Sequence, residues 1–348
     1  MKKKILIMGI ETSCDETAVS IIQDNGTKPP KILANIVSSQ EKVHKKFGGV
    51  VPELAARSHL EKIEMITKKA LKKSRVKLND ISAISATAGP GLIVCLSVGF
   101  NFAKSLSLAL KKPLIAVNHL EGHALSPMFK SNIKFPYLLL LISGGHTQYL
   151  IVKGLGRYKR IGTTIDDALG EAFDKTAQML GLRYPGGPEI EKKAQKSLGI
   201  KKFNFPKPMI NQNNLDFSFS GLKTAVRRKL QLNNLSEQFV RDISFNFQLS
   251  VLECLINKCE RAINLFRKKF DCDLSLIVSG GVAANIFIRK GFKKLAKEKG
   301  VKLIVPDPKY CVDNATMIAW ACIERMVTGD LGDKLYTLPK PRWPLDTL

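Results

Sequence analysis

Leu114-Ile115-Ala116-Val117 is followed directly by Asn118-His119-Leu120-Glu121-Gly122-His123-Ala124 in this chain of 348 residues. The apolar run predicts a buried strand, and the residues after it predict a helix on which His119 and His123 share one face, about one turn apart. Two imidazoles at this spacing can hold one metal ion. Zinc peptidases share the spacing, but here Glu121 points away from the histidine pair. The general base of a peptidase is therefore missing, and a metal-dependent peptidase is disfavoured.

The residues before this stretch alternate between strand and helix patterns. Ile81 to Ala86 predicts a strand and Leu92 to Leu110 a helix, with Gly89-Pro90-Gly91 between them. The run from Ile81 to Ala103 carries no charge and is long enough to cross a bilayer, but the Gly-Pro-Gly break favours a buried strand followed by a buried helix. Strand, helix, strand and helix in this order indicate an α/β lobe, in which ligands bind beyond the strand ends.

The residues near the N-terminus predict a meander of three strands. Ile5 to Glu11 and Thr17 to Ile22 form an antiparallel pair joined by a polar turn, and Ile32 to Ser38 is the third strand. From Pro52 to Lys73 the apolar residues recur at helical spacing, which predicts a long helix. His59 on that helix is interpreted as a packing or surface residue rather than a metal ligand.

A second group of strands follows. Tyr137 to Ile142 is an apolar strand that runs into Ser143-Gly144-Gly145, and Gln148 to Val152 is the next strand. Leu274 to Val278 likewise runs into Ser279-Gly280-Gly281. Backbone N–H groups at glycines can approach an anion closely, and a serine hydroxyl adds a donor. Two such turns at strand ends favour a nucleotide-binding cleft, although the chain has neither a Walker lysine motif nor GxGxxG.

Helical patterns fill most of the remaining sequence. Ala168 to Leu180 is a predicted helix, and Asp166 and Asp167 are interpreted as its N-terminal caps. Glu237 to Phe270 is a long helical stretch that we expect to be broken once. Asn285 begins a further helix. Its side chain either caps that helix or hydrogen-bonds a purine.

Short motifs lie in a characteristic order over nearly the whole chain. Besides His119-Leu120-Glu121-Gly122-His123, they are Gly9-Ile10-Glu11-Thr12-Ser13-Cys14-Asp15-Glu16-Thr17, Gly48-Gly49-Val50-Val51-Pro52-Glu53-Leu54-Ala55, Ser143-Gly144-Gly145-His146-Thr147, Asp166-Asp167-Ala168-Leu169-Gly170-Glu171-Ala172-Phe173-Asp174-Lys175, Tyr184-Pro185-Gly186-Gly187-Pro188, Ser279-Gly280-Gly281-Val282-Ala283-Ala284-Asn285 and Asp313-Asn314. With these motifs the chain resembles the Kae/Qri family of tRNA adenosine threonylcarbamoyltransferases, and within it the bacterial TsaD branch.

The resemblance implies a two-lobed α/β fold of the type shared by actin, heat-shock chaperones and sugar kinases (ASKHA), with duplicated mixed sheets flanked by helices. The first lobe is expected to span residues 1–130 and to pack with a C-terminal helix at 313–335. The second lobe is expected to span residues 131–312, with a helical insertion at about 165–270. The helix from Pro52 is the expected contact with a paralogous partner.

The resemblance also implies a set of site residues. Asp313, which would ordinarily cap the helix predicted from Asn314 to Met326, becomes a third metal ligand beside His119 and His123. The expected substrate-binding residues are Ser143, Gly144, Gly145, His146, Thr147, Asp174, Gly187 and Asn285. Secondary candidates are Glu11, Ser13, Cys14, Glu121, Gly280 and Gly281.

The implied reaction moves the threonylcarbamoyl group from threonylcarbamoyl-AMP to the exocyclic amine of adenosine 37 in tRNAs reading codons that begin with adenine, and releases AMP. Two imidazoles and a carboxylate leave open positions on a bound ion, as in catalytic sites. One divalent metal per subunit is expected; the ligands suit Fe(II) or Zn(II), with Fe(II) preferred. The implied partners are tRNA, a TsaB-like paralogue and a TsaE-like ATPase, while a separate synthase makes the adenylate and no membrane is involved.

Composition adds weaker indications. The formal charge of +25 suits a polyanionic partner, but it also reflects basic residues spread along the whole chain. The seven cysteines include no CxxC pair, which fits reduced thiols in a cytoplasmic protein. Glu11, Asp15 and Glu16 follow the first apolar run too closely for a signal peptide.

Three alternatives remain open beside the transferase. One is an ATPase or kinase of the same superfold, which would need a cleft acid for magnesium. The second is the disfavoured peptidase. The third is a catalytically inactive nucleotide-binding scaffold, which would have no reason to keep His119, His123 and Asp313 together.

Overall fold

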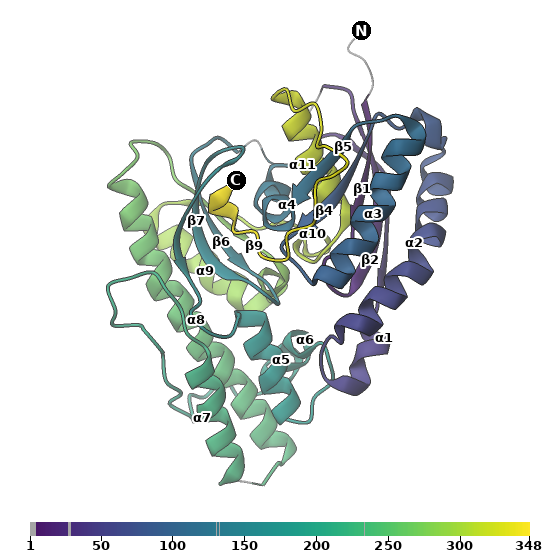
Figure 1. Cartoon of the computed structure of the whole chain (residues 1–348). Helices are drawn as coiled ribbons and strands as arrows, with labels where there is room; N and C mark the ends of the chain where they lie inside the picture. Colours follow the sequence, from purple (N-terminus) through teal and green to yellow (C-terminus); the bar gives the residue numbers. More distant parts are fainter. Residues whose placement is uncertain (1–4, 27–28, 130, 132, 233) are drawn as a thin grey trace. The chain divides into compact units, whose positions relative to one another are not determined.

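The structure is a computed structural model that describes residues 5–26, 29–129, 131, 133–232 and 234–348 (Figure 1). The chain divides into two compact units. Unit 1 comprises Met1–Ile133 and Val312–Leu348, and unit 2 comprises Lys134–Cys311. Residue 130, at which the first predicted lobe ends, lies outside the described residues.

Unit 1 is built on one mixed sheet with the strand order β3-β2-β1-β4-β5. Its strands are β1 (Ile5–Glu11), β2 (Glu16–Asp24), β3 (Lys31–Ser39), β4 (Ala83–Gly89) and β5 (Leu114–Asn118). Its helices are α1 (Glu41–His44), α2 (Pro52–Ser74), α3 (Ile93–Leu110), α4 (His119–Leu125) and α11 (Ala315–Val327), with short 3-10 turns at Lys45–Phe47, Leu78–Asp80, Ser126–Phe129 and Leu345–Thr347. β2 is antiparallel to β1 and β3, whereas β1, β4 and β5 run parallel.

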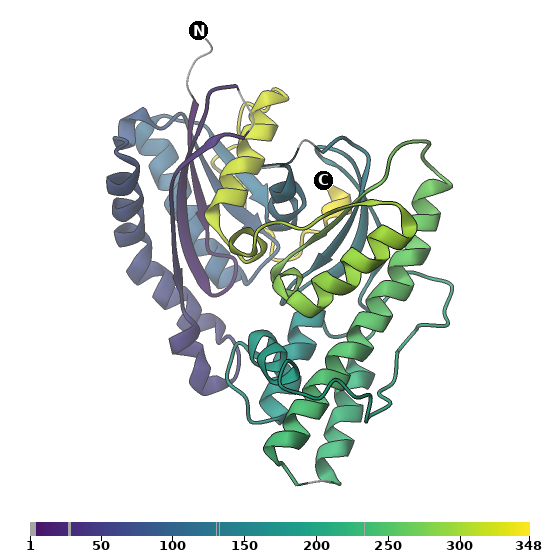
Figure 2. The ribbon, with the colours of Figure 1, turned by 180° about the vertical axis from the view of Figure 1, so that it is seen from behind.

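Helices cover both faces of this sheet. α2 and α3 lie on one face and α11 on the other, as the two opposite views show (Figures 1 and 2). The core beneath α2 and α3 joins strand residues such as Ile10 and Ile84 to Ile63 and Phe100. α3 is the single described helix that is long and apolar enough to cross a membrane, and one such helix is weak evidence for a membrane protein. Its contacts with β4 and α2 agree with the predicted strand-then-helix interpretation.

Unit 2 repeats the same sheet topology with the strand order β10-β9-β6-β7-β8. Its strands are β6 (Tyr137–Ile142), β7 (Thr147–Gly154), β8 (Arg157–Thr163), β9 (Ser275–Ser279) and β10 (Lys302–Ile304). Its helices are α5 (Leu169–Met179), α6 (Gly186–Ala194), α7 (Ser220–Gln231), α8 (Glu237–Arg267), α9 (Ile286–Lys299) and α10 (Pro308–Cys311), with a 3-10 turn η4 at Gly281–Ala284. β7 is antiparallel to β6 and β8, whereas β6, β9 and β10 run parallel.

The two sheets therefore share one plan. Each has a three-stranded antiparallel meander followed by two parallel strands on the other side of its first strand. The hydrophobic core of unit 2 joins alternate residues of β6 and β7, such as Leu140 and Tyr149, to Phe173 of α5 and Phe247 of α8. Duplicated mixed sheets flanked by helices were predicted, and the structure confirms this fold class.

Two predictions about unit 2 were wrong. α8 is one continuous helix of 31 residues rather than a broken one, because Glu237–Arg267 contains neither proline nor glycine. Asp166 and Asp167 do not cap α5, whose N-cap Ala168 makes no side-chain cap bond. Asp166 instead accepts hydrogen bonds from the backbone N–H groups of Phe219 (2.8 Å) and Ser220 (3.4 Å) at the start of α7. The sequence patterns had not indicated α7 or β8.

Candidate metal and nucleotide sites

The histidine pair lies at the junction of β5 and α4. Asn118 ends the strand, and its side-chain oxygen accepts hydrogen bonds from the N–H groups of Leu120 (2.9 Å) and Glu121 (3.3 Å). This cap fixes the helix start, so His119 and His123 lie one turn apart with ring centroids 4.8 Å from each other. Both rings are buried, at 6% and 0% exposure.

Asp313 reaches the same place from the other end of the chain. It directly precedes α11, but Asn314 is the N-cap of that helix and accepts the N–H of Met317 (3.2 Å). The cap position is therefore filled by Asn314. α11 packs closely on β1. The space at Gly9 shows this, since a Cβ there would lie 2.4 Å from the carbonyl oxygen of Ala315. Only glycine allows this approach.

The donor atoms of the three residues converge. Asp313 Oδ1 lies 3.0 Å from His123 Nε2 and 3.4 Å from His119 Nε2. One ligand atom from each residue lies within 4.8 Å of the others. Glu121 is buried at 2% exposure and is not a member of this cluster, in agreement with its predicted direction away from the pair.

Glu11 lies behind His119. It ends β1, which pairs in parallel with β4, while β4 pairs in parallel with β5; the ends of β1 and β5 thus meet at one edge of the sheet. Glu11 is 1% exposed, and its Oε2 accepts the Nδ1–H of His119 (3.1 Å) and the hydroxyl of Thr87. Its Oε1 accepts the N–H of Ser13 (2.5 Å), and the Ser13 hydroxyl lies 3.2 Å from His119 Nδ1.

The charges of this cluster shift its pKa values. Burial alone would lower the pKa of His119, but the carboxylates of Asp313 and Glu11 raise this pKa to about 9. Burial would raise the pKa of Glu11, yet the charge and hydrogen bond of His119 hold the pKa of Glu11 below its ordinary value. The cluster therefore favours the ionised form of the Glu11 carboxyl group, which contacts His119.

Cys14 lies in the turn between β1 and β2. Burial, followed by the charge of Asp15, raises the pKa of the Cys14 thiol well above its ordinary value, so the thiol stays protonated. The carbonyl oxygen of Cys14 accepts the Nε2–H of His59 (2.9 Å). His59 Nδ1 then accepts the hydroxyl of Thr17 (2.8 Å). His59 is thus a packing residue, as predicted.

The residues of the cluster fit a divalent metal ion. Two imidazole nitrogens and one carboxylate oxygen are a common ligand set for Zn(II) and Fe(II). A carboxylate that accepts the second ring N–H of a ligating histidine is the usual support for such a ligand, and Glu11 occupies this place behind His119.

In unit 2, the two Ser-Gly-Gly segments are neighbours. β6 and β9 pair in parallel with Leu141 opposite Ser279, so both strands end at the same edge. Gly280 has a φ of 97°, and a Cβ there would lie 2.4 Å from the carbonyl oxygen of Ile142. In the other segment, the Ser143 hydroxyl accepts the N–H of His146 (3.1 Å), which closes the turn between β6 and β7.

α5 meets the first of these segments, and α6 packs against α5. The Thr147 hydroxyl accepts the N–H of Leu169 (2.8 Å), and the carbonyl oxygen of Ser143 accepts the N–H of Gly170 (3.1 Å). Asp174 follows one turn along the same face of α5. Its Oδ1 accepts the N–H of Gly186 (2.7 Å) at the start of α6.

Asn285 is the N-cap of α9. Its Oδ1 accepts the N–H of Ile288 (2.9 Å), and its amide donates to Oε1 of Gln248 (2.8 Å). The neighbouring N–H of Ile286 donates to Oε1 of Glu191 on α6 (2.6 Å). The structure thus brings Asn285 near α6.

Four glycines of the predicted set share one property. At Gly144, Gly145, Gly187 and Gly281 an added Cβ would meet no other protein atom within 4 Å, and none of them has a positive φ. Neither packing nor backbone conformation therefore requires glycine at these positions. The close approach of a ligand to the backbone would require it.

Sequence patterns did not single out Thr87, Glu191 or Gln248, which contact Glu11, the start of α9 and Asn285. Thr87 could have been noticed because it is, with Ser85, one of two polar residues in a fully buried strand. The other two are ordinary polar residues of helices, and only the contacts identify them.

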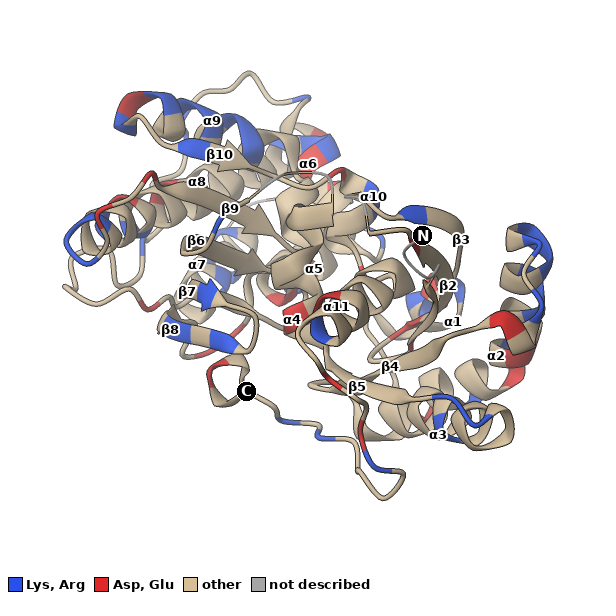
Figure 3. Cartoon of the chain, turned by 90° about the horizontal axis from the view of Figure 1, so that it is seen from above, with Lys and Arg blue, Asp and Glu red and all other residues tan. Residues whose placement is uncertain are grey.

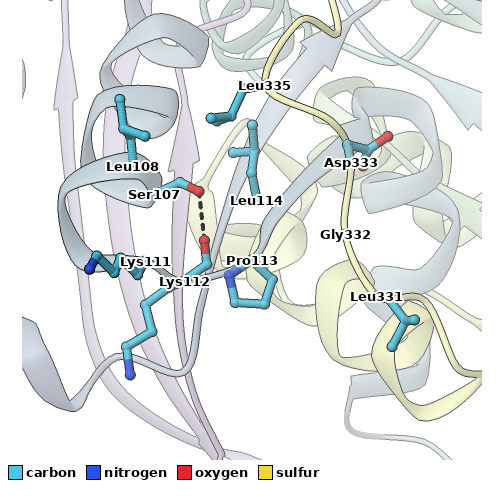
Figure 4. Close-up of a pocket in the computed structure, with 10 residues that line it drawn as sticks. All are labelled: Ser107, Leu108, Lys111, Lys112, Pro113, Leu114, Leu331, Gly332, Asp333 and Leu335. Atoms are coloured by element: carbon cyan, nitrogen blue, oxygen red, sulfur yellow. Dashed lines mark hydrogen bonds between the residues drawn. The ribbon is translucent and has the colours of Figure 1, made fainter.

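A separate surface pocket of about 290 Å³ lies in unit 1 (Figure 4). The end of α3, the start of β5 and Leu331–Leu335 form its wall, and none of the predicted site residues lines it. Asp333, one of the residues that line this pocket, is bound to β5: the Asp333 carboxylate accepts the N–H of Ala116 (2.8 Å).

Comparison with known proteins identifies close relatives. The family model described as tRNA N6-adenosine threonylcarbamoyltransferase, TsaD, matches residues 31–320. The protein of that name from Pelagibacter ubique (strain HTCC1062) is 54% identical over 99% of this chain and 96% of its own length. The Brucella anthropi protein of the same name is 51% identical over 98% of this chain and 95% of its own length.

Among solved structures, HypF from T. kodakarensis resembles this chain with a TM-score of 0.63 and 15% identity. The likeness covers 94% of this chain and 48% of that protein, so the chain spans about half the length of HypF. At this identity the likeness concerns the fold alone, and it agrees with the predicted fold class.

Proposed function

This chain belongs to the TsaD family of tRNA N6-adenosine threonylcarbamoyltransferases, and we propose that it transfers a threonylcarbamoyl group from threonylcarbamoyl-AMP to the exocyclic amine of adenosine 37 in tRNA. The observation that carries this proposal is the convergence of His119, His123 and Asp313 within 4.8 Å. A family member without catalytic function would not need three ligands gathered from residues so far apart in the sequence.

Unit 1 would hold one divalent metal through His119, His123 and Asp313. A bound Fe(II) or Zn(II) ion would supply a Lewis acid that polarises substrate oxygens. Glu11 accepts the Nδ1–H of His119, which leaves Nε2 of that ring directed at Asp313. Thr87 and the N–H of Ser13 hold the Glu11 carboxylate in this position.

Unit 2 would bind the adenylate. The backbone N–H groups at Gly144, Gly145 and Gly281 are the proposed donors to its phosphate, since a ligand can approach the backbone there. Asp174 and Asn285 would orient the nucleoside, with Gly187 next to the ribose. The Ser143 hydroxyl and Thr147 shape the first of the turns that carry these donors.

The transfer needs no protein nucleophile. The amine of adenosine attacks the carbamoyl carbon, the bond from that carbon to the phosphate oxygen breaks, and AMP leaves with the electron pair. The amine loses one proton, for which His146 beside the first Ser-Gly-Gly turn is the candidate acceptor. Donors at the glycine turns stabilise the negative charge that AMP gains. The acceptor base must be accessible, and an anticodon loop offers adenosine outside a regular duplex.

The family also suggests the setting of the reaction. We propose a cytoplasmic enzyme that works with a TsaB-like paralogue and a TsaE-like ATPase, and that receives its adenylate from a separate synthase. Helix α2 is the proposed contact with the paralogue.

Nucleoside analysis of tRNA tests the proposal. The wild-type chain and a His119→Ala variant are incubated with tRNA, threonine, bicarbonate, ATP, the synthase and both partners. We expect modified adenosine with the wild type and a loss of at least about 100-fold with His119→Ala, the upper end of the effect of disturbing a metal site. Bound metal per chain should fall in parallel.

Asp80→Ala is the control, because it removes an exposed carboxylate of the same unit. Equal product from the wild type and His119→Ala would rule out the metal role. Absence of modified adenosine with the wild type would rule out the transferase activity and favour an ATPase or kinase of the same superfold.

A further inference from the structure

Helix α9 carries a concentration of positive charge. Residues 286–302, which comprise this helix and the start of β10, contain seven basic residues and a single acid. The basic residues are Arg289, Lys290, Lys293, Lys294, Lys297, Lys299 and Lys302, and the acid is Glu298. Basic residues make up 55 of the 348 residues of the whole chain, so this segment exceeds the general bias more than twofold. Figure 3 shows the resulting blue segments of the ribbon along α9 and at β10.

Four of these lysines form one exposed row. Lys290, Lys293, Lys294 and Lys297 are exposed, whereas Ile288, Phe292, Leu295 and Ala296 are buried on the opposite face. We call the four the α9 lysine row. Among the described residues, the acid nearest to the row is Glu298, 3.9 Å from Lys294, whose side chain is 81% exposed. The row therefore offers its charges to a partner.

Two of the other three basic residues in this segment, Arg289 and Lys299, have internal roles. Arg289 donates to the carbonyl oxygens of Ala283 (2.5 Å) and Pro306 (2.9 Å). Lys299 forms an ion pair with Glu260 (3.1 Å). These contacts account for two of the seven and leave the lysine row without a comparable structural role.

An ordinary solubilising face does not explain the row well. Such faces usually mix both signs, as α2 does with six basic and three acidic residues. The helix dipole favours cations only in the last turn, which covers Lys297 but not Lys290 or Lys293. A single-sign row is the pattern of a polyanion contact.

The dimensions of the row suit a nucleic-acid backbone. Lys290 and Lys297 are seven positions apart, which corresponds to about 10 Å along the helix axis. Each strand of double-stranded DNA carries a phosphate about every 3.4 Å along the axis, and at a spacing of this order several phosphates lie within reach of the four ammonium groups. The row starts five residues after Asn285, about 8 Å along α9 from the proposed nucleotide site.

We propose that the α9 lysine row binds the phosphate backbone of the tRNA substrate. The inference rests on the proposed function, because it assumes that tRNA is the acceptor. It goes further in assigning a docking surface to four residues of unit 2 that take no part in the chemistry.

Salt-dependent tRNA binding tests the inference. The K290Q/K293Q/K294Q/K297Q variant is compared with the wild type and with K153Q/K159Q/K268Q/K269Q, which removes four exposed lysines elsewhere in unit 2. Glutamine keeps helix propensity close to that of lysine. We expect the slope of log affinity against log salt to fall by roughly 3 to 4 for the α9 variant, with affinity reduced at least about tenfold, and a much smaller effect for the control variant.

Thermal unfolding verifies that both variants remain folded, and nucleoside analysis of the full reaction separates the possible results. Recovery of wild-type turnover by the α9 variant at saturating tRNA would support a docking role. Equal losses in both variants would show an effect of net charge and overturn the inference. Unchanged tRNA binding with lost modification would assign the row to a protein partner instead, and would also overturn it. Absence of product from the wild type would concern the proposed function alone.

Discussion

Glu11 is the residue that links the backbone of unit 1 to the proposed metal ligands. Its two carboxylate oxygens accept hydrogen bonds from Ser13, Thr87 and His119, and it is almost fully buried. A neutral amide of the same shape would keep the packing, but it could accept with only one of its two polar groups. Glu11 is therefore a positioning residue for His119.

We predict that Glu11→Gln lowers metal affinity by about 10- to 100-fold, because the ring of His119 loses its carboxylate partner. Competition with a chelator measures this affinity directly. Thr87→Val should give a smaller loss in the same direction, since it removes one of the bonds that hold Glu11. Metal affinity equal to that of the wild type in Glu11→Gln would contradict the positioning role.

At the scale of elements, Asp166 ties the start of α7 to the segment before α5. Its carboxylate accepts the N–H of Phe219 (2.8 Å) and the hydroxyls of Ser218 (2.5 Å) and Ser220 (2.7 Å). Burial would raise the pKa of Asp166, but these hydrogen bonds lower it below its ordinary value. Asp167 adds ion pairs with Lys175 (2.8 Å) and Lys223 (2.9 Å). The two acids thus connect helices that are distant in sequence.

We predict that Asp166→Ala lowers the free energy of unfolding by about 1 kcal/mol, toward the lower end for a lost cap because the site is partly exposed to solvent. Asp166→Asn should retain most of the stability. Since the folded pKa lies below the unfolded one, the contribution of the charge is present above about pH 4 and is lost as the pH falls through the folded pKa. Urea unfolding at neutral and acidic pH measures both effects; equal stability of the wild type and Asp166→Ala at neutral pH would exclude this role.

At the scale of the whole molecule, the proposed metal ligands depend on how α11 returns to the first sheet. β1, β4 and β5 bring Glu11 and His119 to one edge, and α11 delivers Asp313. Gly9 permits this return, since any Cβ there would lie 2.4 Å from the carbonyl oxygen of Ala315 and 2.8 Å from the nitrogen of Ala319. The C-terminal helix is therefore part of the first unit in structure as well as in the proposed function.

We predict that Gly9→Ala destabilises the protein by about 1–3 kcal/mol through overpacking. The same change should weaken metal binding, because α11 carries Asp313. Gly49→Ala is a matched control, since a Cβ at Gly49 would meet no other atom within 4 Å. Thermal unfolding and metal titration of the two variants measure the effects, and a Gly9→Ala protein with wild-type stability and metal affinity would refute this account of α11.

Most strands and helices could be predicted from local patterns. The strand at Ile5–Glu11 and the helix starting at Pro52 have the predicted bounds to within a residue, because periodicity and a helix-starting proline act locally. β8 and α7 were missed: β8 is an edge strand with charged residues, and the start of α7 is held by Asp166, more than 50 residues earlier in the chain. No local pattern could indicate that bond.

The sequence by itself determined the fold class, the family and the identity of the candidate ligands, since strand periodicity, the spacing of His119 and His123 and the ordered motifs are all written along the chain. Only the tertiary structure decided that Asn314 rather than Asp313 caps α11, that Glu11 supports His119, and that glycines such as Gly187 have open space above them. The physical reason is that caps and hydrogen bonds between distant residues depend on strand pairing and helix packing, which bring together side chains that no local pattern relates.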